Sequence, residues 1–268
     1  MDELHQGAEL AEATMMAQFA LQAPAEIKAA RGIALTQIAG ATILSTREDP
    51  TGYWSKAVGF VEPVNEQLID EVIDFYRSEG NARAVIQVPP WAMPDDWSEI
   101  ASKHRLSQGT SIVKLIRRVD EIAPASTELR IGEIDPSQAE EWAKTVLEGF
   151  GMSGLDLEQI VARFGNLEGH HMYAAWDGDR MVAGGALTIH KSVGYGSTAA
   201  TLPQYRGQGA QSALIALGDR AAQEKGCQWS VTDTGMPAEG DTSNPSYNNL
   251  RRSGFDILYQ RRNWIWTA

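Results

Sequence analysis

One stretch, residues 198–222, constrains the fold of this chain more than any other. An apolar run that favours a strand ends at position 202, a turn with glycines at 207 and 209 follows, and alanine-rich residues then continue with helical spacing. A strand, a glycine turn and a helix in this order point free backbone N–H groups and a helix N-terminus at an anion. Gly207 and Gly209 accept a positive φ and let the backbone approach a ligand closely. The stretch therefore predicts a phosphate-binding turn.

Two common phosphate motifs fit this turn poorly. A P-loop requires Gly-Lys-Ser/Thr, in which the lysine reaches the phosphates and the hydroxyl binds magnesium, whereas Gly209 is followed by Ala210 and Gln211. A dinucleotide fingerprint requires a third glycine where this chain has Ser212, and it belongs to a fold of repeated βαβ units that the sequence does not predict. Nucleotide hydrolysis and dinucleotide binding are therefore disfavoured.

A third motif fits better. Residues 206–211, Arg-Gly-Gln-Gly-Ala-Gln, resemble the acetyl-CoA signature Gln/Arg-x-x-Gly-x-Gly/Ala of GCN5-related N-acetyltransferases (GNAT). Gln211 departs from that signature, which has a small residue at its last position. Asn244-Pro-Ser-Tyr-Asn-Asn-Leu, followed by Ser253-Gly-Phe, resembles the late helix of the same family, in which an asparagine helps to hold the cofactor. The separation of the two motifs also agrees with that family.

The resemblance implies where acetyl-CoA binds. Strand 193–202 and strand 228–234 would splay apart, and the pantetheine arm would lie between them, paired with the main chain like an added strand. Backbone N–H groups of the glycine turn would bind the pyrophosphate, and an asparagine of the late helix would reach the arm near the thioester. The implied cofactor-binding residues are Thr201, Leu202, Arg206, Gly207, Gln208, Gly209, Ala210, Gln211, Asn244 and Asn249.

The implied chemistry is direct attack of an amine on the thioester, which needs a base for the ammonium and an acid for the departing thiolate. The family often places a tyrosine acid where this chain has Leu250, so Tyr247 is the nearest substitute. The strand at 193–202 contains no carboxylate that could act as the base, and Asp233 at the end of the next strand is our main candidate. The alternatives are a water-mediated base, His190 and Glu148.

Other residues of these types are expected to be structural. His170 and His171 are interpreted as loop histidines, and Cys227 as a buried strand residue. A single cysteine excludes an internal disulfide, fits a reducing cytoplasm and leaves no cysteine cluster for zinc, so no metal is expected.

The pattern of elements predicts two halves of the same order, residues 1–119 and 129–268, joined by a polar linker at 120–128. Elements are expected in the first half at 7–23 (helix), 33–45 and 55–61 (strands), 65–80 (helix capped by Asn65), 84–88 (strand), 95–106 (helix) and 110–119 (strand). Those expected in the second half are 129–134 (strand), 136–150 and 157–164 (helices), 172–176 and 181–189 (a hairpin), 193–202 (strand), the helix after the glycine turn, 228–234 (strand), 245–253 (helix) and 255–266 (one or two strands).

The first half lacks the phosphate-binding turn. At the corresponding place, residues 58–68 contain one glycine and no Arg-Gly-x-Gly, and Glu62 and Glu66 would repel a pyrophosphate. We therefore interpret residues 1–119 as a degenerate acetyltransferase domain that covers the sheet edge of the active half and shapes the acceptor pocket.

Composition narrows the partners. A net charge of −12 disfavours nucleic acid and is compatible with a cationic amine, although acidic surfaces usually serve solubility. No apolar run approaches the roughly 20 residues that span a bilayer. The N-terminal residues do not show the basic region followed by an apolar core that is typical of a signal peptide, so none is expected. A cytoplasmic protein without a membrane partner is expected, and its oligomeric state, a homodimer included, stays open.

The sequence therefore predicts an α/β protein with a mixed sheet, built from two tandem acyl-CoA N-acyltransferase domains. Its expected activity is transfer of an acetyl group from acetyl-CoA to the amine of a small molecule. Two alternatives stay open: a CoA-binding sensor or scaffold without turnover, and a transferase of another acyl group on the same fold.

Overall fold

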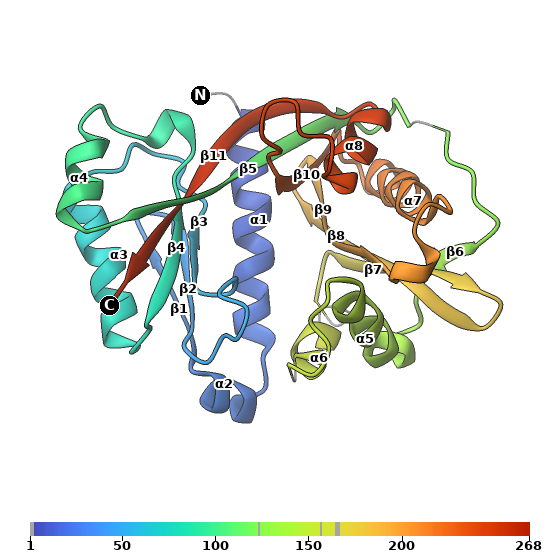
Figure 1. Cartoon of the computed structure of the whole chain (residues 1–268), viewed down its shortest axis with the longest axis horizontal. Helices are drawn as coiled ribbons and strands as arrows, with labels where there is room; N and C mark the ends of the chain where they lie inside the picture. Colours follow the sequence, from blue (N-terminus) through green and yellow to red (C-terminus); the bar gives the residue numbers. More distant parts are fainter. Residues whose placement is uncertain (1–2, 123, 156, 164–166) are drawn as a thin grey trace. The chain divides into compact units, whose positions relative to one another are not determined.

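The computed structural model describes residues 3–122, 124–155, 157–163 and 167–268. The chain forms two compact units, Met1–Lys114 with Leu258–Ala268, and Leu115–Ile257 (Figure 1). Each unit is described by itself. In the described ranges, no helix is both long enough and apolar enough to cross a membrane.

The first unit is a mixed sheet with helices. Its elements are α1 (Glu3–Gln22), α2 (Ala25–Arg31), β1 (Ile33–Ile38), β2 (Ala41–Thr46), β3 (Lys56–Val58), α3 (Glu66–Ser78), β4 (Arg83–Gln87), α4 (Trp97–Lys103), most of β5 (Ser107–Arg118) and most of β11 (Asp256–Thr267). The strand order in this unit is β1-β2-β3-β4-β11-β5. The segment 33–45, expected as one strand, is a hairpin, because Ala39 and Gly40 both adopt positive φ (48° and 82°) and turn the chain back.

Helix α3 forms as the sequence predicts. The Asn65 side chain accepts a hydrogen bond from the Leu68 N–H at 2.9 Å, which satisfies one of the free donors of the first turn. One face of the helix, Ile69, Val72, Ile73 and Tyr76, is buried in the core of the unit. The expected N-cap and apolar stripe are both confirmed.

Strand β11 completes the sheet of the first unit. It runs antiparallel to β4, with Trp264 opposite Ile86 and Trp266 opposite Ala84, and both tryptophans join the core beside α3. The sequence pattern predicts these C-terminal residues as part of the second half of the chain. The structure groups Leu258–Ala268 with the first unit instead.

Helix α1 buries two carboxylates, which its sequence pattern did not indicate. Glu9 and Glu12 are fully buried, as are the methionines Met15 and Met16 of the same helix. Arg261 of β11 donates to both carboxylates, and Lys114 of β5 donates to Glu12 at 2.7 Å. The buried charges are therefore paired, as burial of an ion requires.

The second unit is also a mixed sheet. Its elements are β6 (Arg130–Glu133), α5 (Ala139–Gly149), α6 (Glu158–Val161), β7 (His170–Asp177), β8 (Arg180–His190), β9 (Val193–Thr201), α7 (Ala210–Glu224), β10 (Trp229–Gly235) and α8 (Pro245–Arg252), with the end of β5 beside β10. The strand order is β10-β9-β8-β7-β6, parallel between β9 and β10 and antiparallel elsewhere. The expected helix at 157–164 is α6, although Phe164 lies outside the described residues, as does Ala123 of the expected linker.

Two glycines let helices pack closely on the two faces of this sheet. A Cβ atom on Gly184 would stand 2.6 Å from Trp142 of α5, and one on Gly194 would stand 2.7 Å from Ala222 of α7. Helices α5 and α7 accordingly lie on opposite faces of the sheet (Figure 1). This packing sets the glycine turn before α7 at the carboxyl end of β9.

Candidate functional site

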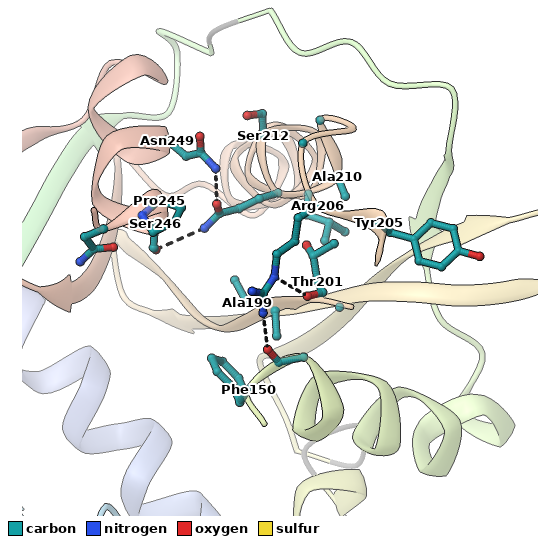
Figure 2. A pocket seen from close by; sticks show the side chains of 18 of the residues that line it. Phe150, Ala199, Thr201, Tyr205, Arg206, Ala210, Ser212, Pro245, Ser246 and Asn249 are labelled. Atoms are coloured by element: carbon teal, nitrogen blue, oxygen red, sulfur yellow. Dashed lines mark hydrogen bonds between the residues drawn. The ribbon is translucent and has the colours of Figure 1, made fainter. Parts of the chain in front are cut away.

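The second unit contains a cavity of about 580 Å³ at the start of α7. Its walls come from the end of α5, strands β8 and β9, the turn before α7, the first turns of α7, and α8 (Figure 2). Among the described residues, the lining includes two arginines, Arg206 and Arg252, and no aspartate or glutamate, although the whole chain carries a net charge of −12. Such a lining favours an anionic ligand.

The glycine turn has the predicted backbone. Gly207 and Gly209 have φ of 79° and 80°, which confirms the expected positive values, and α7 begins directly afterwards at Ala210. Gly209 is the N-cap residue, so no side chain caps the first N–H groups of α7. These donors are left for water or a ligand.

The segment before β6 supports this turn from behind. Thr127 Oγ1 donates a hydrogen bond to the Gln208 carbonyl oxygen at 2.7 Å. A Cβ atom on Gly209 would collide with the carbonyl oxygen of Ser126 and stand 3.4 Å from the Cβ of Thr127. Glycine at 209 is therefore required by a contact inside the protein.

Arg206 hydrogen-bonds the turn to strand β9 and to the end of helix α5. Its guanidinium donates to the Thr201 carbonyl at 3.3 Å and to the Gly149 carbonyl at 3.0 Å (Figure 2). Gly149 ends α5 and packs against β9, where a Cβ would stand 2.8 Å from the Cβ of Ala200. Two donors of Arg206 are thus used on main-chain carbonyls at the floor of the cavity.

Strands β9 and β10 separate beside the cavity. Their parallel pairing runs from Val193 and Trp229 to Gly196 and Thr232 and stops there. On its other side β9 carries a β-bulge, because the register jumps between Ser197 and Ala200 and Thr198 has a φ of 54°. The free stretch of β9 beyond Gly196 leads into the cavity, which fits the splay that the family resemblance implied.

Eight of the ten predicted cofactor residues line the cavity: Thr201, Arg206, Gly207, Gly209, Ala210, Gln211, Asn244 and Asn249. Leu202 does not. It is buried, its N–H donates to the Val182 carbonyl and its carbonyl accepts from Tyr205, both at 2.9 Å. Gln208 is not part of the lining either, and its carbonyl is the acceptor for Thr127.

Gln211 turns away from the glycine turn and toward α8. Its Nε2 donates to Ser246 Oγ at 3.2 Å, and its Oε1 accepts from Asn249 Nδ2 at 2.5 Å (Figure 2). The side chain that departs from the family signature therefore bridges the first turn of α7 to α8.

The two asparagines of the late helix have partners inside the protein. Asn244 is the N-cap of α8, where its Oδ1 accepts from the Tyr247 N–H at 3.1 Å and its Nδ2 donates to the Gly235 carbonyl at 2.7 Å. Asn249 accepts from Arg252 through its Oδ1 in addition to donating to Gln211.

The predicted catalytic residues Asp233 and Tyr247 do not belong to the cavity lining. Asp233 stands on β10, one residue after the pairing with β9 ends, and its Oδ2 accepts from the Tyr195 hydroxyl at 3.1 Å. Tyr195 is 1% exposed and was not predicted as a site residue. The signal that reveals it is the strand register: Tyr195 pairs with Val231, and Asp233 follows two residues later on the same face.

The remaining candidates have varied surroundings. His190 ends β8, and burial lowers the pKa of its imidazole; Glu148 precedes the last residue of α5. His170 and His171 belong to strand β7, which corrects their assignment to a loop.

Cys227 lies just before β10, and burial raises the pKa of its thiol, as expected for a structural cysteine. Across the described ranges, no three His, Cys, Asp or Glu side chains are arranged to hold a metal.

Comparisons with known proteins agree with this architecture. Residues 137–240 match the family model described as acetyltransferase (GNAT) family. No curated protein matches. A GCN5-related N-acetyltransferase from Kribbella flavida aligns with 14% identity and a TM-score of 0.64 over 97% of this chain and 95% of that one.

Two further solved structures align with most or all of this chain. A tandem GNAT protein from the clavulanic acid biosynthesis pathway aligns with 13% identity and a TM-score of 0.55 over 100% of this chain and 95% of that one. A functionally unknown conserved protein from Staphylococcus epidermidis aligns with 9% identity and a TM-score of 0.62 over 87% of this chain and 92% of that one. At these identities the likeness concerns the fold, and the predicted mixed α/β fold of two tandem halves is confirmed.

Proposed function

We propose, from the premise that residues 137–240 match the GNAT family of acetyltransferases, that the protein is an acetyl-CoA-dependent N-acetyltransferase that acts on the amine of a small molecule. Family membership supports acyl transfer as the class of reaction. The acetyl group, the CoA carrier and the amine acceptor are the specific parts of the proposal. The single cysteine, Cys227, favours the cytoplasm as its location.

The composition of the cavity carries the proposal. A volume of about 580 Å³ lies within the range of about 300–1,000 Å³ that ligand pockets have. Its described lining residues include two arginines and no carboxylate, and the first N–H groups of α7 have no side-chain cap. A pyrophosphate fits these donors, because a helix N-terminus favours negative charge and offers N–H groups in the direction of the helix axis.

The pantetheine arm would follow the free part of β9. Beyond Gly196 this strand has no partner on the β10 side, so its main chain offers N–H and carbonyl groups to an extended ligand. The residues that carry this pairing are those from Ser197 to Thr201. Leu202 contributes less than the sequence indicated, because both of its main-chain groups are already hydrogen-bonded.

In the proposed reaction Asp233 is the base and Tyr195 holds its carboxylate by the 3.1 Å hydrogen bond. Asp233 takes a proton from the ammonium of the acceptor. The amine nitrogen then forms a bond to the thioester carbon, the carbon–sulfur bond breaks, CoA leaves as a thiolate, and the nitrogen releases its surplus proton to water. Tyr247 stays our candidate for the acid that protonates this thiolate.

Among its described residues, the first unit has no turn equivalent to the glycine turn before α7. Strand β3 lies parallel to β4, as β9 does to β10, but the segment after it buries Phe60 and Val64 in the core. Asn65 caps α3, and Glu66 forms an ion pair with Lys103 at the start of that helix. These features support one cofactor site per chain, in the second unit.

A CoA-binding protein without turnover is the second candidate. The specific observation in its favour is Leu250, which is buried where the family often places a tyrosine acid. The same cofactor site would then report acetyl-CoA without transferring its acyl group.

Two measurements on the full chain test these proposals. Titration calorimetry with acetyl-CoA should give one site per chain, and a panel of small amines should then show amine-dependent release of free CoA thiol, with the acetylated amine identified by mass spectrometry. Binding without amine-dependent thiol release would favour the sensor, and absence of binding would overturn both candidates. Two sites per chain would overturn the assignment of the first unit.

A further inference from the structure

Two arginines line the cavity, and they differ in how many of their donors are used. Arg206 donates to two main-chain carbonyls. Arg252, in the last turn of α8, donates one guanidinium N–H to Asn249 Oδ1, and within the described residues it forms no ion pair. Its neighbour Arg251 does not line the cavity and donates to the Phe255 carbonyl and to Asp256. Arg252 therefore has more of its five guanidinium donors left for a ligand than Arg206 has.

A chain of side-chain amides orients this arginine. Gln211 Nε2 donates to Ser246, and Asn249 Nδ2 donates to Gln211 Oε1. An asparagine amide has its donors on one side and its acceptor on the other. Once Nδ2 of Asn249 is held by Gln211, the Oδ1 of the same amide points the other way and accepts from Arg252. The position of Arg252 thus depends on Gln211 through Asn249.

We propose that Arg252 binds a phosphate group of the donor nucleotide and that Gln211 is the positioning residue that holds Arg252 for it. This inference rests on the proposed function, since it names how the same site recognises acyl-CoA. A guanidinium suits a phosphate because it is always charged and offers paired N–H donors in one plane. In the part of the chain that the structure describes, the lining contains no carboxylate that would compete for it. Acyl-CoA offers two such groups, the pyrophosphate and the 3′-phosphate of the ribose.

The inference explains why glutamine stands at 211. A small residue there would leave the backbone donors of the glycine turn unchanged, but it would remove both hydrogen bonds that join α7 to α8. Asn249 could then rotate its amide, and the contact to Arg252 would no longer be fixed. Loss of Gln211 should therefore act on donor binding through Arg252.

The test measures the Kd of acetyl-CoA by titration calorimetry for the full-length protein and four variants. Arg252→Gln should raise Kd roughly tenfold to hundredfold, the size expected for hydrogen bonds to a charged group. Gln211→Ala should raise it roughly three- to tenfold, and the double variant should bind no more weakly than Arg252→Gln alone. Arg251→Gln removes the same charge from the same helix turn outside the cavity and should leave Kd within about twofold. Melting temperatures verify that all variants are folded.

Acetyl-CoA that lacks the 3′-phosphate separates the two phosphate sources. If Arg252→Gln changes the Kd of this analogue little, Arg252 binds the 3′-phosphate, and if the change equals that for acetyl-CoA, Arg252 binds the pyrophosphate. Unchanged affinity of Arg252→Gln for both donors would overturn the inference, as would losses that multiply in the double variant. Failure of the wild-type protein to bind acetyl-CoA would instead overturn the proposed function.

Discussion

The main-chain carbonyl oxygen of Ser126 occupies the space in which the Cβ atom of any residue other than glycine at position 209 would stand. Gly209 also has a φ of 80°, a backbone conformation that costs other residues roughly 1–2 kcal/mol. The segment before β6 and the glycine turn are therefore fitted to each other. Gly207 has a similar φ of 79°, but a Cβ atom added there would have no other atom within 4 Å beyond its chain neighbours.

This contrast predicts different costs for two matched substitutions. Gly207→Ala should lower the free energy of unfolding by about 1–2 kcal/mol through its φ alone. Gly209→Ala should cost roughly 2–5 kcal/mol, because the collision with Ser126 adds the penalty of overpacking. Urea unfolding of both variants measures the difference. Equal costs would mean that the contact with Ser126 does not constrain the turn.

The hydrogen bond between the Tyr195 hydroxyl and the Asp233 carboxylate gives a prediction on catalysis. If Asp233 is the base, Asp233→Asn should lower kcat by roughly 10²–10⁴-fold. Tyr195→Phe keeps the buried ring and removes only the 3.1 Å hydrogen bond, so kcat should fall roughly tenfold while the KM for acetyl-CoA stays near its wild-type value. Steady-state kinetics with the best amine of the panel provide both constants.

A double variant separates positioning from a general loss of stability. Once Asp233 is replaced by asparagine, Tyr195→Phe should lower kcat no further, because the hydroxyl acts through the carboxylate. A further tenfold loss in the double variant, or a rise in KM without a change in kcat, would show that Tyr195 does not serve Asp233.

Local patterns predicted the local structure well. The Asn65 cap and the stripe of α3, the helix after the glycine turn, and the hairpin around Gly178 depend on residues close in the sequence, and all three formed. The turn at Ala39 was missed because alanine rarely adopts the positive φ that it has there. The place of β11 was missed because pairing with β4 joins residues far apart in the chain.

In the candidate site, too, features that depend on neighbouring residues were predicted and features that depend on residues far apart in the chain were missed. The glycine turn was predicted from a contiguous motif, whose residues need no tertiary information. Tyr195 was missed because its relation to Asp233 depends on the register between two strands. The bridge from Gln211 to Asn249 joins two helices, and a sequence alone does not say which way a long side chain points.

The buried ion network of the first unit gives a prediction on stability. Arg261 donates to both Glu9 oxygens at 2.8 Å, and all three side chains of Arg261, Glu9 and Glu12 are almost completely buried. Burial by itself raises the pKa of the Glu12 carboxyl, but Arg261, Lys114 and Lys56 outweigh it and hold that pKa well below its ordinary range. Arg261→Met should therefore cost roughly 3–5 kcal/mol, because it leaves buried carboxylates without their main cation.

A paired replacement tests whether the charge or the shape matters. Glu9→Met combined with Arg261→Met should be more stable than Arg261→Met alone, since the uncompensated charge at Glu9 is gone. Asp74→Asn, which breaks an exposed pair with Arg77, serves as the control and should cost less than about 1 kcal/mol. Urea unfolding measures all three. If the paired replacement is no better than the single one, the cost comes from lost packing.

His170 gives a prediction on pH. It is 6% exposed, its Nδ1 lies 2.6 Å from Thr188 Oγ1, and burial lowers the pKa of its imidazole to about 4 from the ordinary 6.5. Between these two pH values the unfolded chain binds a proton that the native chain does not. The free energy of unfolding should therefore fall as the pH drops from 6.5 toward 4.

The expected loss attributable to His170 is roughly 2–3 kcal/mol at pH 4.5 relative to pH 7.5. Urea unfolding across this range should show it in the wild-type protein, and His170→Gln should be less sensitive to pH by about that amount. The Glu12 network does not interfere above pH 4.5, because its carboxyl contributes stability that is lost only as the pH falls below the ordinary pKa of 4.5. Equal slopes for the wild-type protein and His170→Gln would mean that His170 is protonated in the native state and that its charge is compensated inside β7 and β8.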